Sequence, residues 1–312
     1  MPRRKRFIPP RALVEVSART IQARYLLRPS PELNRRFIGI LARARRRYDV
    51  KVHVVTCMSN HWHALLSPKD AWHLARFMNF VQGNLAKEAG ELHDWDGPFW
   101  SGRYHAVLVS EEAEVQHRRL SYCLAQGAKE GLVARPEIWP GVHCVCALRD
   151  GEPLRGVWYD RTAHCLDRRR RGEAPNLEDY ASDELLVLDP LPCWEAEDLT
   201  DSEIRCRVAE IVETISREAA AERQTAGSRP SDPRHFLKVE PHHKPKTTKR
   251  SPAPLVHAGT RATRQRFRQA YGIFLQAFHD AAASLQAGRT NVAFPEGSFP
   301  PGLPFVPLLE PG

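Results

Sequence analysis

Two short β-rich runs separated by only three residues constrain the fold of this chain most strongly. The runs cover residues 51–57 and 61–67, and Met58-Ser59-Asn60 between them has the composition of a tight turn. We therefore expect an antiparallel hairpin. Because side chains alternate along a strand, His61 and His63 should point to one face, and Trp62 should point to the other face, into the core.

The segments on either side of this hairpin predict a mixed α/β domain. Further strands are expected near residues 12–20 and 103–109. Helices are expected near 31–48, 70–89 and 111–127, where apolar residues recur at helical spacing. This order predicts an α/β plait with a central antiparallel sheet, whose two principal helices cover one face and leave the other to the histidines.

The helix expected over 111–127 carries a polar stripe formed by Arg118, Tyr122, Gln126 and Lys129. A phenol has a pKa of about 10 and attacks phosphorus effectively only when a base or a cation assists it. Arg118 and Lys129 could supply that positive charge. The ordinary alternative for a single helical tyrosine is a surface side chain with a polar edge.

The histidine pair could hold a metal together with the amide of Gln126. An isolated His-x-His is more often a pair of ordinary, partly buried imidazoles. Two imidazoles and an amide oxygen suit Mn²⁺ and softer metals, whereas Mg²⁺ prefers oxygen ligands. Chemistry alone therefore leaves the ion open between these divalent metals.

Positive charge is concentrated at the start of the chain. The net charge is +9, yet residues 1–47 contain fourteen Arg or Lys and only two acids, Glu15 and Glu32. Such a region is typical of proteins that bind a phosphate backbone, and a solubilising surface is the alternative. The candidate nucleic-acid contacts are Arg3, Arg4, Lys5, Arg6, Arg35, Arg36, Arg46, Arg47, Arg103, Arg118 and Lys129.

No segment of the sequence is apolar enough to suggest a membrane span or a signal peptide. The seven cysteines are scattered through a long chain, which favours reduced thiols. We therefore expect a cytoplasmic protein, associated with the nucleoid when it is bound to DNA.

Three blocks of the sequence resemble the single-tyrosine HUH transposases, in particular the IS200-like branch associated with repetitive extragenic palindromes (REP). The blocks are residues 58–66, 97–105 and 122–133, and the resemblance spans about residues 10–145. The chain departs from the usual family pattern at three places. Ser59 replaces a proline, Gln126-Gly127 replaces Asn-Pro, and Leu124 replaces a histidine.

The resemblance implies the ferredoxin-like HUH fold and a transposase that cleaves and rejoins single-stranded DNA. Tyr122 would form a 5′-phosphotyrosine linkage, and His61, His63 and Gln126 would hold Mg²⁺ or Mn²⁺. The DNA would be single-stranded or a hairpin, and a homodimer is a further partner that the family implies. Two alternatives remain, a domesticated protein that binds structured nucleic acid without cutting it and, more weakly, a zinc-dependent hydrolase.

The remaining sequence divides by composition. We expect an HUH domain over 1–147, a partly helical extension over 148–225, and a basic Pro-rich linker over 226–259. An amphipathic helix is expected over 260–290 and a Pro-rich tail over 291–312. His242 and His243 fall in the linker and are expected to be solvated.

Overall fold

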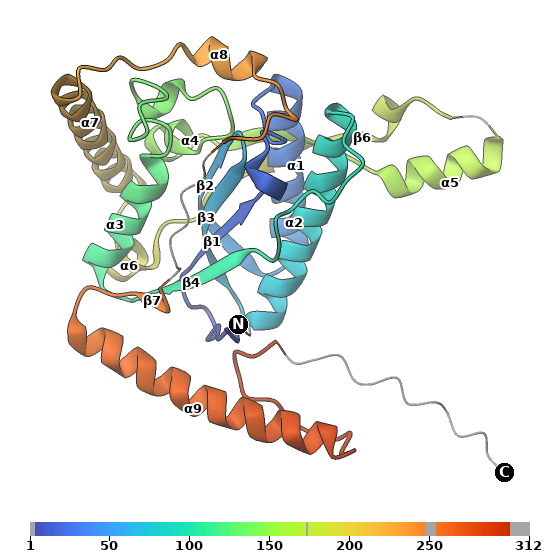
Figure 1. Ribbon diagram of the computed structural model, residues 1–312, viewed down its shortest axis with the longest axis vertical. Coiled ribbons are helices and arrows are strands. Elements are labelled where there is room, and N and C mark those ends of the chain that lie inside the picture. Colours follow the sequence, from blue (N-terminus) through green and yellow to red (C-terminus); the bar gives the residue numbers. More distant parts are fainter. Residues whose placement is uncertain (1–3, 173, 247–253, 300–312) are drawn as a thin grey trace.

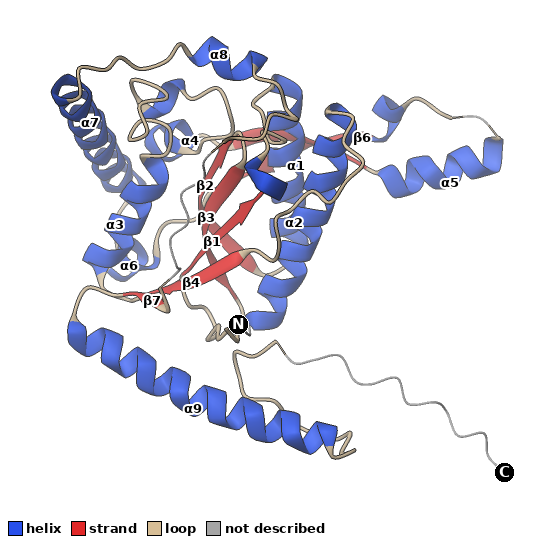
Figure 2. Ribbon diagram, in the orientation of Figure 1, coloured by secondary structure: helices blue, strands red, loops and turns tan. Residues whose placement is uncertain are grey.

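The computed structural model describes residues 4–172, 174–246 and 254–299 (Figure 1). Its centre is a five-stranded sheet of order β2-β3-β1-β4-β7, flanked by helices on both faces (Figure 2). The strands are β1 (Val14–Arg19), β2 (Val50–Met58), β3 (His61–Pro68), β4 (His105–Val109) and β7 (Val256–His257). The first four pair antiparallel, and β7 adds parallel to β4 at the edge.

The first six elements follow the order β1-α1-β2-β3-α2-β4, with α1 at Pro31–Arg47 and α2 at Ala71–Leu92. With this order and this arrangement of strands, the domain is a ferredoxin-like plait, as the sequence predicts. Local signals explain the helix starts, because the side chains of Ser30 and Asp70 accept hydrogen bonds from the first turns of α1 and α2.

Side-chain alternation separates the two faces of the sheet. Trp62 is fully buried and meets the Phe37 ring of α1, with centroids 5.5 Å apart. The neighbouring His63 faces the opposite side, toward α3 (Ala113–Leu124). The helices α1 and α2 therefore cover one face, while α3 crosses the face that carries the histidines.

The part of the chain after residue 124 is mainly helical, as expected, but it also contains a second small sheet. Its helices are α4 (Val145–Asp150), α5 (Arg161–Arg171), α6 (Pro192–Ala196), α7 (Asp201–Thr225), α8 (Pro233–Lys238) and α9 (Arg261–Gln286). The antiparallel strands β5 (Leu154–Tyr159) and β6 (Ala181–Leu186) form the small sheet, which packs on α1. In Figure 1, α5 projects from this unit away from the body of the molecule.

Helix α9 packs on the N-terminal segment of the same chain. The rings of Phe7 and Phe274 lie 4.7 Å apart, and the Tyr271 hydroxyl donates to the Lys5 carbonyl at 2.9 Å. Figure 1 shows α9 beside the β7 end of the sheet. The apolar stripe predicted for this helix is therefore covered within the chain.

The segment expected to be a basic Pro-rich linker, residues 226–259, contains a short helix, α8, among its described residues. Asp232 caps α8 and Pro233 occupies its first turn, which favours helix initiation. Phe236 then inserts against Trp139, with ring centroids 5.1 Å apart. Composition alone missed this short helix because its stability comes from one buried aromatic side chain.

Candidate active site

The β2–β3 hairpin places both predicted histidines on one face of the sheet. His61 and His63 pair with Arg19 and Ser17 of β1, and their ring centroids are 5.2 Å apart. His63 is only 9% exposed. The period of two along β3 thus brings the two imidazoles together, as the sequence predicts.

Helix α3 brings Tyr122 to the same place within the same chain. The ring centroids of Tyr122 and His63 are 5.7 Å apart in an edge-to-face arrangement. The tyrosine is 37% exposed, so part of its side chain is accessible from solvent. A phenol and two imidazoles can therefore face one substrate without a second subunit.

Gln126 lies just beyond the end of α3 and is almost fully buried. Its amide nitrogen donates to the Tyr122 carbonyl at 3.2 Å, and its side chain also hydrogen-bonds His61. The structure therefore brings together all four residues predicted for the site.

His61 is poised to act as a ligand through one nitrogen. Burial, and then the nearby His63 and Arg19, lower the pKa of its imidazole to about 3, so the ring is neutral at physiological pH. Its Nδ1 lies 2.6 Å from Asn60 Oδ1, an acceptor that favours the proton on Nδ1. This tautomer leaves the lone pair on Nε2 for a cation.

Glu15 of β1 is a site residue that the sequence analysis missed. Its carboxylate lies 2.7 Å from Arg119, 3.1 Å from His257 Nε2 and 3.4 Å from His63 Nδ1. Burial alone would raise the pKa of Glu15, but hydrogen bonds from His257 and His63 and the charge of Arg119 hold it well below its ordinary value. The carboxylate is therefore ionised and links β1, β3, α3 and β7.

A sequence signal existed for Glu15 but not for His257. Glu15 is an acid between the core residues Val14 and Val16, so alternation alone places it on the histidine face. His257 belongs to a two-residue strand, which is too short to show any periodicity.

Two cations lie over the Tyr122 ring. The guanidinium of Arg119 is 4.0 Å from the ring centroid and the Lys129 ammonium is 3.5 Å from it. Burial, followed by the charge of Glu15, raises the pKa of the Tyr122 phenol. The hydroxyl is thus protonated at neutral pH, and the cations are placed to stabilise the phenolate when it forms.

Arg118, which the helical stripe predicted beside Tyr122, faces solvent instead. It pairs with Glu114 at 2.6 Å, and its side chain is 57% exposed. Arg119 takes the position beside the tyrosine because Glu15 attracts it toward the sheet. The helical stripe identified the correct face of α3 but the wrong arginine.

Of the basic residues expected at the N-terminus and in the 97–105 block, Arg4, Lys5, Arg6 and Arg103 line one groove of about 450 Å³, together with Tyr104 and Tyr271. Arg3 lies outside the described residues.

The four candidate contacts on α1, Arg35, Arg36, Arg46 and Arg47, lie on the face of the sheet that α1 and α2 cover, away from the histidines. Arg36 is 8% exposed and bonds Glu32 at 2.6 Å and Glu88 at 2.5 Å, so the expectation that it contacts phosphate is wrong. Arg46 pairs with Glu184 of β6 at 2.9 Å, and Arg47 lies over the rings of Tyr48 and Phe80. Arg35 is exposed. Arg36, Arg46 and Arg47 therefore support the packing of α1 against α2 and β6.

The donor set fits a divalent metal only if Gln126 takes part. Within residues 4–172, 174–246 and 254–299, no three or more His, Cys, Asp or Glu side chains are grouped to hold an ion. His63 Nδ1 lies 3.4 Å from the Glu15 carboxylate, so Nε2 is the nitrogen that His63 can offer to a metal, as it is for His61. Two imidazoles and one amide oxygen are ligands that Mn²⁺ accepts and that Mg²⁺ accepts less readily.

Comparison with known proteins gives one family match. Residues 20–119 match the family model described as transposase, IS200 like. No curated protein matches the chain. Among the described residues, no helix has the length and apolar character needed to cross a membrane.

Two solved structures resemble part of this chain. One is described as a REP-associated tyrosine transposase bound to a REP hairpin and is 12% identical in sequence, with a TM-score of 0.38. The similarity covers 45% of this chain and 81% of that protein. The other is a Deinococcus radiodurans R1 protein described as a transposase, 17% identical, with a TM-score of 0.27, covering 35% of this chain and 86% of its own.

Proposed function

We propose that this chain, an IS200-like transposase over residues 20–119, cleaves and rejoins single-stranded DNA through Tyr122. The family match ends three residues before Tyr122, so the role of the tyrosine rests on its geometry. The observation that carries the proposal is the approach of Tyr122 to His63, with ring centroids 5.7 Å apart in one chain.

The proposed reaction is a transesterification. The Tyr122 oxygen loses its proton and bonds to the scissile phosphorus, while the bond from phosphorus to the 3′ oxygen breaks and that oxygen takes up a proton. The strand is left with a free 3′-hydroxyl and a 5′-phosphotyrosine linkage. Because one phosphoester replaces another, attack by a second 3′-hydroxyl can reverse the step without a separate energy source.

The residues around the tyrosine have distinct roles in this proposal. His61, His63 and Gln126 would hold Mg²⁺ or Mn²⁺, which supplies charge to polarise the phosphate. Arg119 and Lys129 stabilise the developing phenolate, and Glu15 orients His63 and Arg119. The groove of Arg4, Lys5, Arg6 and Arg103 binds the DNA backbone.

The substrate that we propose is a hairpin-forming single strand. One solved structure that resembles part of this chain is described as a REP-associated tyrosine transposase bound to a REP hairpin, and this chain has a groove lined by Arg4, Lys5, Arg6 and Arg103. Since Tyr122 faces the histidines of its own chain, one subunit can carry out cleavage without a homodimer.

A second candidate is a protein of the same fold that binds structured nucleic acid without cutting it. The raised pKa of Tyr122 favours this alternative, because a protonated phenol is a weak nucleophile. Leu124, which stands where the family usually has a histidine, is fully buried and adds no polar group.

Adduct formation separates the two candidates. We would incubate the full chain with hairpin-forming single strands labelled at the 3′ end, in Mg²⁺, in Mn²⁺ and in EDTA, and resolve the products on denaturing gels. Strand transfer predicts a labelled protein band that requires the metal. Binding without any such band, in either metal, would support the non-cutting alternative.

A further inference from the structure

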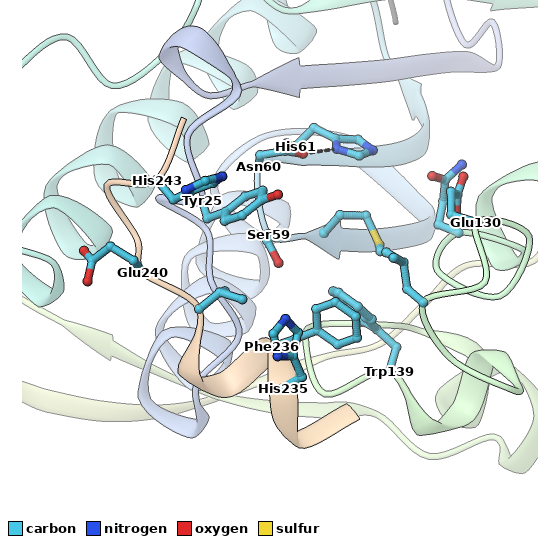
Figure 3. Close-up of a pocket in the computed structure, with 14 residues that line it drawn as sticks. Tyr25, Ser59, Asn60, His61, Glu130, Trp139, His235, Phe236, Glu240 and His243 are labelled. Atoms are coloured by element: carbon cyan, nitrogen blue, oxygen red, sulfur yellow. Dashed lines mark hydrogen bonds between the residues drawn. The ribbon is translucent and has the colours of Figure 1, made fainter. Parts of the chain in front are cut away.

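A cavity of about 500 Å³ opens directly beside the candidate active site (Figure 3). It shares His61 and Gln126 with that site. Figure 3 shows His61 and Asn60 on one side of this space, Tyr25 on a second, and Trp139 with Phe236 on a third. The space therefore continues from the place where the scissile phosphate would lie.

A segment far from the family match forms one wall of the cavity. Residues 233–243, which we call the strap, begin with α8 and continue along its rim (Figure 3). His243 stacks on Tyr25 with centroids 5.3 Å apart, and His242 Nε2 lies 2.6 Å from the His93 carbonyl. Both histidines, expected to be solvated, therefore contact the domain.

The charges around the cavity differ from those around Tyr122. Glu130 and Glu240 are among its lining residues, and no Arg or Lys is found among the described residues that line it. Arg119 lies instead at the Tyr122 ring, and Lys129 lies over the same ring with its ammonium 3.6 Å from the Glu130 carboxylate, which leaves Glu240 as the lining carboxylate farther from a cation. A phosphate is therefore favoured at the tyrosine and disfavoured in the cavity, whereas a neutral group with N–H donors is favoured there.

We propose that the cavity binds one unpaired nucleobase of the strand whose phosphate lies at Tyr122. This inference rests on the proposed function and specifies its substrate contacts. A base has a flat face that can stack on the ring of Tyr25, Trp139 or Phe236. The N–H groups at the edge of the base can donate hydrogen bonds to the carboxylates of Glu130 and Glu240. The strap thereby gives the chain after residue 225 a direct part in substrate binding.

The test measures binding without cleavage. In a Tyr122→Phe background, fluorescence anisotropy would give the Kd for a labelled, unfolded oligonucleotide of mixed sequence and for an abasic strand of equal length. We expect Tyr25→Leu and His243→Ala to raise the Kd for the base-bearing strand about tenfold. The Kd for the abasic strand should not change.

Matched controls are available on other elements. His279→Ala removes an exposed histidine of α9, and Trp72→Leu removes an exposed ring of α2, and neither should alter either Kd. His243 is exposed, so its variant keeps the test valid if Tyr25→Leu lowers the melting temperature. If the variants weakened binding of both strands equally, the contact would be to the backbone and the proposal would be overturned. An unchanged Kd for both strands would also overturn it.

The result is independent of the covalent chemistry. Failure of wild-type protein to form an adduct would refute the transesterification but leave the comparison of the two strands intact. Adduct formation with no preference for bases over abasic strand would refute the base site alone.

Discussion

Glu15 is the single residue that connects most parts of the candidate site. Its carboxylate contacts His63, Arg119 and His257, which come from β3, α3 and β7. When a carboxylate accepts a hydrogen bond from the ring nitrogen that does not bind a metal, it fixes the orientation and tautomer of the histidine. The second ring nitrogen is then held in position to bind the metal. The fold thus sets the orientation of His63, a proposed metal ligand, through its contact with Glu15.

Substitution of Glu15 by Gln should weaken metal binding. The amide keeps the size of the side chain but loses the charge that holds His63 and Arg119, so we expect Mn²⁺ affinity to fall by roughly 10–100-fold. Isothermal titration calorimetry with Mn²⁺ would measure the affinity of the wild-type and variant proteins. Glu114→Gln, on the exposed side of α3, is the control. Unchanged affinity in Glu15→Gln would show that His63 needs no such support.

The raised pKa of Tyr122 predicts how the rate of adduct formation depends on pH. Because the phenol stays protonated at neutral pH, the fraction of phenolate rises with pH about tenfold per unit below the pKa. Single-turnover rates measured from neutral to mildly alkaline pH should therefore increase without a plateau. A flat profile would mean that loss of the phenol proton does not limit attack.

At the scale of elements, α1 and β5 approach so closely that only glycine fits between them. A Cβ on Gly39 would lie 2.0 Å from the Val157 carbonyl oxygen, and one on Gly156 would lie 2.2 Å from the Gly39 nitrogen. The absence of two side chains is what lets the β5–β6 unit dock on α1. Arg43 and Arg46, paired with Glu184, support the same contact.

Two glycine-to-alanine substitutions should have opposite effects on stability. Gly39→Ala creates a clash with backbone and should destabilise the fold by about 3 kcal/mol. Gly83→Ala, in the interior of α2 with open space around it, should stabilise by roughly 1 kcal/mol. Urea denaturation of both variants gives the comparison. Equal free energies of unfolding would contradict the close packing of α1 on β5.

Glu112 links α3 to the start of α9 and makes this contact sensitive to pH. Hydrogen bonds from Ser110, Gly259 and Thr263 lower the pKa of its carboxyl to about 2. A carboxyl whose folded pKa is depressed adds stability above its ordinary pKa, about 4.5, and this contribution is lost as the pH falls toward 2.

Glu112→Gln should therefore lower the melting temperature at neutral pH, and the difference from wild type should narrow below about pH 4.5. Thermal unfolding over a series of pH values measures this difference. Glu111→Gln, at the exposed neighbouring position, should show no such trend. A difference that stays constant with pH would show that the charge of Glu112 has no part in docking α9.

Periodicity predicted the central elements well and the peripheral ones poorly. The plait of four strands with its helices α1, α2 and α3, the facing of His61 and His63, and the burial of Trp62 follow from local patterns. The β5–β6 sheet, α8 and β7 depend on contacts with distant residues, such as Gly39 and Trp139, which no local pattern encodes. For the same reason His257 and Arg119 were missed at the site.

The basic residues of the N-terminal region lie on two different surfaces of the protein. The arginines of α1 lie on the face of the sheet that α1 and α2 cover. There, Arg36, Arg46 and Arg47 contact residues of α2 or β6. Arg4, Lys5 and Arg6 join Arg103 in the groove next to α9. The concentration of charge in the sequence thus does not correspond to one continuous DNA-binding surface.

The salt dependence of DNA binding should distinguish these surfaces. Each phosphate contact to a single strand contributes about 0.7 to the slope of log K against log salt concentration. We expect Arg4→Ala and Arg103→Ala each to reduce the slope by about that amount, and Arg46→Ala to leave it unchanged. A reduced slope in Arg46→Ala alone would place the DNA on the opposite face.

Tyr122 is the proposed nucleophile of a DNA strand-transfer reaction. Its most direct test is mass spectrometry of the protein after reaction with hairpin-forming single strands and Mn²⁺, to locate the nucleotide-bearing residue. We expect the adduct on Tyr122, its loss in Tyr122→Phe, and its persistence in Tyr48→Phe. An adduct on another residue, or one that survives Tyr122→Phe, would contradict it.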